Sequence, residues 1–323
     1  MNSQNTDNVK EPFFSGRKLL FISVLSRSSV LALLCLFALW TEYLNLKVAY
    51  NSARLVELST GSDSPRYGKI LRIFYETSDS FFSLFGDPVK VMQTNGGMTW
   101  SIRVMGVPFT DPIAGISFFS QNFYLPAGFA LGMLIPLLMA CLFGRIFCAY
   151  ICPASLLFFT IARLRRFLSK WLLLPDIELN RNLAWGVFAG GLIMTAVSGY
   201  GIWILLLPYF AIGQTIFHGL AFGVLSMTYV VILFFVFVDL CAGQQFTCRY
   251  LCPTGRLLGA IGSRAVISVR RDASRCISSC NACTDICPMK ADPKTDRQLD
   301  CSLCGECLSV CPSKCLYTGF KEK

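Results

Sequence analysis

The chain of 323 residues is 54% hydrophobic and only 15% charged, and its mean hydropathy is +0.54. These values exclude an ordinary soluble domain and favour a membrane protein. A net charge of +10 is typical of some nucleic-acid-binding proteins, but here the basic residues gather beside the apolar segments, where they act as a topology signal. We therefore expect a membrane location and no nucleic-acid partner.

Four apolar segments are long enough to cross a membrane as helices. They lie at residues 19–50, 123–143, 183–207 and 220–240, the last three within a region that we delimit as 122–260. A polar N-terminal segment, residues 1–18, precedes the first span. The polar stretch 51–121 is too long for a tight connection, so it is expected to fold as a small extramembrane subdomain.

The distribution of Lys and Arg predicts the orientation of these spans. Six Lys and Arg lie between Arg145 and Arg181, whereas "PYFAIGQTIFHG", between the third and fourth spans, contains none. Because cytoplasmic loops carry the excess of basic residues, the first of these loops and both termini are predicted to be cytoplasmic. The expected location is the bacterial inner membrane, crossed several times, with the 51–121 subdomain on the outer side.

Sixteen cysteines and one histidine, His218, limit the chemistry that the chain supports. A dense set of disulfides is typical of small secreted scaffolds, and this chain is neither small nor preceded by a cleavable signal sequence. A single histidine does not supply both axial ligands of a haem, and no CxxC pair is followed by histidine. Metal bound by sulfur is therefore favoured.

The segment "CLFGRIFCAYICP" (141–153) repeats at an offset of one hundred residues as "CAGQQFTCRYLCP" (241–253). Cysteine, tyrosine and proline coincide, and each copy follows an apolar span, which indicates an internal duplication. On a helix the cysteines of a CxxxC pair lie one turn, about 6 Å, apart on one face. The duplication would bring both pairs into one redox or metal site, formed by Cys148, Cys152, Cys248 and Cys252.

The alternative is that these cysteines are buried packing residues, as we expect for Cys35 in the first span. Cys141 and Cys241 lie about 10 Å further along the helix and are assigned to packing or to support of the site. Four thiolates suffice for a cubane or a tetrahedral metal, and the sequence leaves open which of these is bound.

The last part of the chain, residues 261–323, carries two dense cysteine runs, "CISSCNACTDICP" and "CSLCGECLSVCP". The second has the spacing C-x2-C-x2-C-x3-C-P of bacterial ferredoxins, and the first departs from it by one residue between Cys276 and Cys280. In such proteins the fourth cysteine of each run binds the cluster of the other run. The pattern predicts two [4Fe-4S] clusters, one held by Cys276, Cys280, Cys283 and Cys311 and the other by Cys301, Cys304, Cys307 and Cys287. Zinc is the structural alternative for paired CxxC motifs, and Cys315 is left over as a packing residue.

With both ferredoxin runs and both CxxxCP copies in place, the chain resembles the membrane-bound polyferredoxins of the NapH type, with relatives of the NosR and NosH types and in methylamine utilisation. The resemblance rests on "GVPFTDPIAGISFF" (106–119), "FGRIFCAYICP" (143–153), "CRYLCPTG" (248–255) and the ferredoxin tail. It implies a quinol dehydrogenase component. Such a protein takes electrons from the membrane quinone pool and passes them to a respiratory reductase through a ferredoxin-like or cytochrome c partner.

The expected fold is therefore mainly α, a four-helix integral membrane protein with an internal duplication and a small C-terminal ferredoxin domain with two [4Fe-4S] clusters. Polar residues near the span ends are candidates for quinol deprotonation: Glu42, Tyr209, Gln214, His218 and Asp239. The second function that we weigh is an assembly or redox-sensing factor for a respiratory reductase, which would use the same clusters without oxidising quinol.

Overall fold

A computed structural model of the chain describes residues 15–49, 65–98, 100–180, 182–199, 201–222, 227–277, 279–294 and 300–320. Helices dominate it, so the prediction of a mainly α protein is confirmed. The chain divides into two compact units. Unit 1 comprises Met1–Val30, Pro136–Gly191 and Phe234–Lys323, and unit 2 comprises Leu31–Ile135 and Leu192–Leu233.

The predicted spans differ in length in the structure. In helix α1, Gly16–Ala49, the stretch Gly16–Thr41 is long and apolar enough to cross a membrane. The other apolar helices are shorter: α6 is Ala127–Phe143, α9 is Leu183–Ser198 and α12 is Thr228–Ala242. Among the described residues, one helix therefore meets the length and composition of a span.

A glycine follows two of these apolar helices and explains where they end. Gly144 and Gly199 follow α6 and α9 with φ of +67° and +86°, the left-handed conformation that commonly closes a helix. The backbone N–H of Gly199 also donates to the Thr195 carbonyl. The third predicted span, 183–207, is consequently divided into α9 and the short helix α10, Ile202–Leu206.

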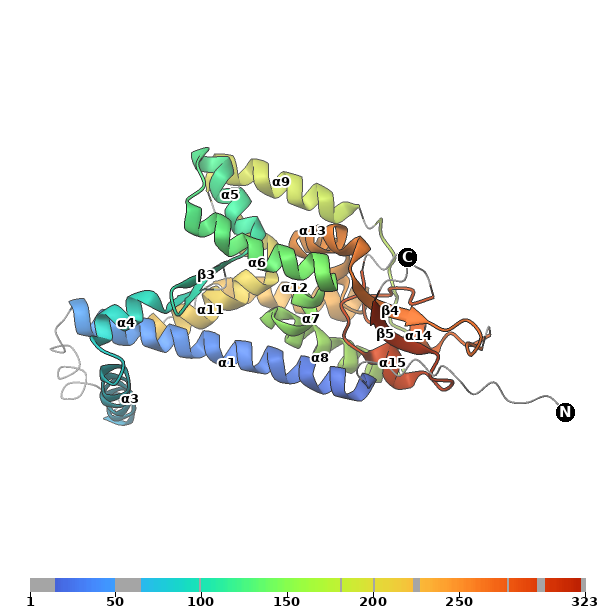
Figure 1. The fold of residues 1–323 in the computed structure, drawn as a ribbon, viewed down its shortest axis with the longest axis horizontal. Coiled ribbons are helices and arrows are strands. Elements are labelled where there is room, and N and C mark those ends of the chain that lie inside the picture. Colours follow the sequence, from blue (N-terminus) through green and yellow to red (C-terminus); the bar gives the residue numbers. More distant parts are fainter. Residues whose placement is uncertain are drawn as a thin grey trace. The chain divides into compact units, whose positions relative to one another are not determined.

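Unit 2 contains the described part of the polar stretch 51–121 and also a helix in a segment expected to connect two spans. Its elements include α3, Pro65–Ser83; α4, Pro88–Thr94; α5, Pro112–Asn122; and α11, Pro208–Phe222. Strands β1 (Gly96–Met98), β2 (Ser101–Val104) and β3 (Val107–Thr110) form an antiparallel sheet in that order. Figure 1 shows α4 beside the C-terminal part of α1, where Tyr43, Phe82 and Met92 form a buried cluster.

Two helices of unit 2 begin with the same local signal. Asp87 and Asp111 cap α4 and α5, and each is followed by proline at the first helical position. The carboxylate of Asp111 accepts the backbone N–H of Ile113 at 2.7 Å. The Asp-Pro pair therefore fixes where α5 starts and leaves the Asp111 side chain facing the unit interior, where it is 6% exposed.

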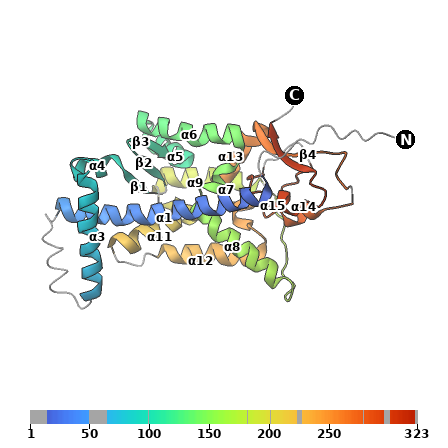
Figure 2. The same cartoon turned by 60° about the horizontal axis from the view of Figure 1, so that its bottom comes forward.

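Unit 1 contains both CxxxCP copies and the ferredoxin runs. The first copy forms α7 (Ile146–Tyr150) and α8 (Pro153–Leu168), and the second forms the π-helix η1 (Thr247–Leu251), α13 (Pro253–Ile261) and the 3-10 turn η2 (Gly262–Arg264). The tail forms β4 (Ile267–Arg271), α14 (Ala282–Ile286), α15 (Glu306–Val310) and β5 (Leu316–Phe320). Strands β4 and β5 pair antiparallel with Val269 opposite Thr318, beside the two short helices (Figure 2).

Candidate functional site

The first set of predicted ligands surrounds one pocket in the tail. Cys276 and Cys280 precede α14, Cys283 lies on α14 and Cys311 follows α15, and all four line the pocket. The β4–β5 ladder holds the start of the first run beside the end of the second, and next to it the Asp272 N–H donates to the Cys315 carbonyl at 2.8 Å. The structure therefore brings these four cysteines together, and we call them set 1.

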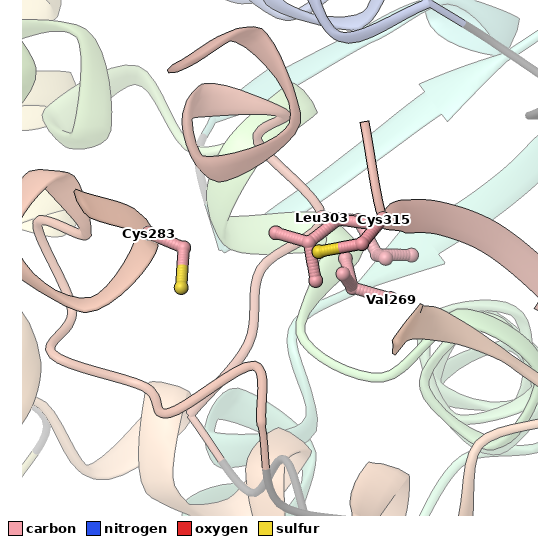
Figure 3. Close-up of a cluster of buried hydrophobic side chains, with 5 residues drawn as sticks. Val269, Cys283, Leu303 and Cys315 are labelled. Carbon is pink, nitrogen blue, oxygen red and sulfur yellow. The ribbon is translucent and has the colours of Figure 1, made fainter. Parts of the chain in front are cut away.

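Cys315, the left-over cysteine, lies at the edge of set 1. Its Sγ is 3.5 Å from that of Cys311, and its side chain is 3% exposed. Figure 3 shows Cys315 against Leu303 and Val269, with Cys283 standing apart on its own helix. This environment is that of a packing residue that also lines the pocket of set 1 and interacts with two of its predicted ligands, Cys311 and Cys276.

The second set of predicted ligands lies deeper in unit 1. Burial raises the pKa of the Cys301 and Cys287 thiols to about 12 each. Burial also raises the pKa of Cys307, and negative charge on Cys301, Cys304 and Cys287 raises it further, so these four thiols, set 2, are neighbours. Buried thiolates are costly unless metal binding stabilises the deprotonated form.

The two CxxxC pairs also meet, and they form set 3. Burial and then the thiolate charges of Cys148 and Cys252 raise the pKa of Cys152. Desolvation likewise raises the pKa of Cys248, and thiolate charge on Cys252, Cys152 or Cys148 would raise it further, so these thiols lie near one another. The repeat at an offset of one hundred residues thus places all four thiols of the two copies side by side.

The local geometry of set 3 corrects the helical spacing expected from the sequence. Cys152 and Cys252 lie beyond α7 and η1 in extended conformation, with ψ of 117° and 109°. Pro153 and Pro253 follow them, and a residue before proline is pushed out of the helical region. The two cysteines of each pair are therefore separated by a helix end, and both copies share this turn.

The donor chemistry of the three sets fits iron–sulfur clusters. Each set offers four cysteines and no histidine, the ligand set of a [4Fe-4S] cluster. A tetrahedral zinc instead gathers four sulfurs within about 2.3 Å of one ion. Within the described ranges, no three His, Cys, Asp or Glu side chains are close enough to hold a single metal ion.

A buried ion pair joins set 3 to set 2. Arg145 Nη1 donates to Asp300 Oδ1 at 2.8 Å, and its Nη2 donates to the Cys248 carbonyl at 3.0 Å. Asp300 directly precedes Cys301 of set 2, and both side chains of the pair are almost fully buried. A Cβ on Gly255 would lie 2.3 Å from Arg145 Nη2, so only glycine leaves room for the guanidinium at that position.

The residues predicted to handle quinol protons are divided between the two units. Tyr209, Gln214 and His218 belong to α11 of unit 2, where His218 Nδ1 lies 2.8 Å from the Gln214 carbonyl of its own helix. Asp239 belongs to unit 1, accepts the Thr247 N–H at 2.7 Å and lies near the Cys248 thiol. The Glu42 side chain lies outside the described residues.

Tyr209 has a partner that the sequence did not identify. Its hydroxyl donates to Asp111 Oδ2 at 2.9 Å, and both side chains are buried. Burial raises the pKa of Asp111 to about 6, while the hydrogen bonds from Tyr209 and from backbone N–H groups oppose that rise. The Asp-Pro signal in "FTDPIAG" predicts a helix cap, but nothing local predicts a contact with a tyrosine 98 residues away.

Comparison with known proteins agrees with this donor chemistry. Residues 125–171 match the family model described as a 4Fe-4S binding domain, and this segment contains Cys148 and Cys152 but no tail cysteine. No solved structure matches the chain.

Three curated relatives are ferredoxin-type proteins. The NapH protein of Haemophilus influenzae is 29% identical over 64% of this chain and 69% of its own length. The NapH protein of Escherichia coli is 28% identical over 60% and 65%, and the methylamine utilization protein MauN of Methylorubrum extorquens is 30% identical over 58% and 63%. The chain thus spans about two thirds of these relatives, and its resemblance to the NapH type is confirmed.

Proposed function

We propose that the chain is an integral membrane iron–sulfur protein that oxidises quinol and relays the electrons to a partner of a respiratory reductase. The observation that carries this proposal is the gathering of three sets of four cysteines within unit 1. Cysteine sets of this kind hold clusters for electron transfer and offer no nucleophile or acid–base pair for hydrolysis. The ferredoxin-type names of the NapH and MauN relatives support the same chemistry.

Sets 1 and 2 are proposed to hold one [4Fe-4S] cluster each, and set 3 a third redox or metal centre. A bound [4Fe-4S] cluster supplies one-electron transfer. The chain's own residues hold and orient these centres: the β4–β5 ladder closes set 1, and Arg145 and Asp300 tie the loop of set 2 to that of set 3. Electrons are proposed to pass between neighbouring sets toward a ferredoxin-like or cytochrome c partner.

Quinol oxidation to quinone also releases two protons, which need an acceptor in the protein. We assign this role to the Asp111–Tyr209 pair, because a buried carboxyl whose pKa is raised to about 6 binds a proton more readily than an ordinary aspartate. Tyr209 Oη holds the Asp111 carboxylate in place through its hydrogen bond. Asp239 is proposed as a second acceptor, beside Cys248 of set 3.

The proposed topology has four spans with both termini in the cytoplasm. Helix α1 supplies one span, and α6, α9 and α12 supply the others as shorter apolar helices. Basic residues between α6 and α9 support a cytoplasmic location for that segment. A reporter fused after Lys170 should give a cytoplasmic signal, and an external signal there would contradict this topology.

The experiment that tests the proposed function adds a quinol to the purified protein without oxygen and follows cluster reduction by low-temperature EPR. We expect reduced clusters in the wild-type protein and no quinol-dependent reduction in the Cys148→Ala plus Cys248→Ala double variant, whose tail clusters should still be reduced by dithionite. Clusters that dithionite reduces and quinol does not would instead favour the assembly or redox-sensing role. If quinol still reduces the clusters of the double variant normally, the cysteines of set 3 are packing residues.

A further inference from the structure

Arg27 is the charged residue that interrupts the apolar part of α1, and the structure buries it in unit 1. Its side chain is 2% exposed. Arginine keeps its charge in proteins, and ionisable residues within apolar spans are usually functional because burying them is costly. The placement of this cation therefore calls for a negative group nearby.

The hydrogen bonds of Arg27 do not supply that negative group. Its Nε and Nη2 donate to the carbonyl and the hydroxyl of Ser23, at 3.1 and 2.8 Å. Its Nη1 donates to the carbonyl and the hydroxyl of Ser155, at 3.2 and 3.1 Å. All four acceptors are neutral, so the donors are satisfied while the positive charge is not balanced by them.

Thiols of two different cysteine sets, and more weakly the Glu306 carboxylate, act on the Arg27 charge. Cys304 of set 2 and Cys152 of set 3 are the two ionisable groups that act most strongly on the Arg27 charge. Arg27 also lines one pocket together with Cys148 and Cys248 of set 3 and Cys304 of set 2. The guanidinium therefore lies where the two sets approach each other.

The internal duplication gives this position a counterpart. Ser155 accepts hydrogen bonds from Arg27, and it aligns with Gly255 at the offset of one hundred residues. Gly255 in turn packs against the Arg145 guanidinium. Each copy of the motif thus carries a buried guanidinium on the first turn of the helix after its CxxxCP. Arg145 has a carboxylate partner in Asp300, whereas every hydrogen-bond acceptor of Arg27 is neutral.

We infer that Arg27 is a positioning residue whose positive charge is shared by set 2 and set 3, and that it raises the reduction potential of the centres bound there. The inference rests on the proposed iron–sulfur function. Reduction adds negative charge to a cluster, and a fixed positive charge a few ångströms away stabilises the reduced form. We expect set 1 to be little affected, because Arg27 does not line its pocket and the two thiols that act most strongly on the Arg27 charge belong to sets 2 and 3.

The test is an EPR-monitored redox titration of the full-length protein carrying Arg27→Gln, Arg27→Lys or Arg163→Gln. Arg163 is the matched control, because its guanidinium lies 4.4 Å from the same Phe159 ring that Arg27 covers at 4.7 Å, but its side chain is exposed. We expect Arg27→Gln to shift the midpoint potential of set 2, and of any centre in set 3, to more negative values. Arg27→Lys and Arg163→Gln should stay near wild type, and set 1 should not shift in any variant.

An unchanged set 2 potential in Arg27→Gln would overturn the inference. Arg27→Gln also removes part of the anchor between α1 and Ser155. If this variant binds no iron, Arg27→Lys decides: normal iron loading and potential show that the site needs the positive charge, and the same loss as in Arg27→Gln assigns Arg27 to anchoring alone. Quinol reduction is measured separately, so a potential that shifts in a protein that quinol does not reduce refutes the proposed function and keeps the inference.

Discussion

The two units of the chain differ in the charged groups that they bury. Unit 1 buries arginines together with the carboxyl groups of Asp239, Asp300 and Glu306, whereas the described residues of unit 2 bury Asp111. Unit 1 encloses the guanidiniums of Arg27, Arg145 and Arg249 among its cysteine sets, and the Nε atoms of Arg145 and Arg249 have no hydrogen-bond partner among the described residues. Unit 2 instead buries the carboxyl group of Asp111 against the hydroxyl of Tyr209.

Under the proposed function, this difference would let the two units handle different products of quinol oxidation, electrons and protons. Buried cations lower the cost of adding electrons to anionic clusters, whereas a buried carboxyl group with a raised pKa accepts protons. Unit 1 is thus suited to electrons, while Asp111 of unit 2, with Asp239 of unit 1 as the second acceptor, is suited to protons. The predictions below disturb one unit at a time.

The largest effect is expected from Asp300→Asn in unit 1. The substitution leaves the Arg145 guanidinium buried without its carboxylate, which should cost about 3–5 kcal/mol of folding free energy and lower iron retention. Thermal unfolding of the purified protein measures this change. Asp272→Asn is the control, since Asp272 is an acid of the same tail whose ion pair with Arg275 is largely exposed, and it should leave the unfolding temperature unchanged.

Asp111→Asn tests unit 2 through the pH dependence of folding stability. Because burial raises the folded-state pKa of Asp111 from 3.8 to about 6, the folded state binds the proton more tightly than the unfolded state. The stability that this proton provides is complete below pH 3.8 and is lost as pH rises to about 6, a change of about 3 kcal/mol for a shift of about two pKa units.

The Asp111→Asn variant should lack this slope in its denaturant unfolding curves between those two pH values. It should also lose about 100-fold or more of the quinol oxidation rate, while dithionite still reduces all clusters. A variant that keeps both the pH slope and the rate would remove Asp111 from the proton pathway.

Gly255→Ala should have an intermediate effect in unit 1. The added methyl group would lie 2.3 Å from Arg145 Nη2, so the guanidinium must move away from Asp300 and the Cys248 carbonyl, at a cost of about 1–3 kcal/mol. Gly190→Ala provides the comparison, because nothing lies within 4 Å of a Cβ built there. Equal unfolding temperatures for the two variants would contradict the close packing of Arg145.

Tyr209→Phe is the mildest change and sharpens the assignment in unit 2. Losing one hydrogen bond to a carboxylate should cost about 1–2 kcal/mol, and it should raise the pKa of Asp111 further, moving the pH-dependent loss of stability upward. Tyr43→Phe removes a similar bond, to Asp79 at 2.7 Å, elsewhere in unit 2. Only the Tyr209 variant should change the pH profile of quinol oxidation.

The sequence predicts the regular parts of this molecule well because they have a repeating pattern. The offset of one hundred residues and the two ferredoxin runs predict which thiols should lie together, and the structure places them side by side; their occupancy by clusters stays a prediction. The mainly helical fold follows from the long apolar segments.

Other features depend on contacts that no local pattern encodes. Tyr209 and Asp111 are 98 residues apart, and Arg27 and Ser155 are 128 apart, so neither pair leaves a periodic signal. The extended conformation at Cys152 and Cys252 is a different case. The prolines that follow them predict it, because a residue before proline disfavours the helical conformation, whereas the spacing of cysteines on an ideal helix does not take proline into account.

The central claim, that unit 1 is built to carry iron–sulfur clusters, is tested most directly by measuring iron and acid-labile sulfide in the purified protein. The account predicts eight irons and eight sulfides per chain for sets 1 and 2, plus any metal bound by set 3. The iron and sulfide bound by sets 1 and 2 should remain in the Cys148→Ala plus Cys248→Ala variant. Zinc in place of iron, or about four irons with every tail cysteine intact, would contradict it.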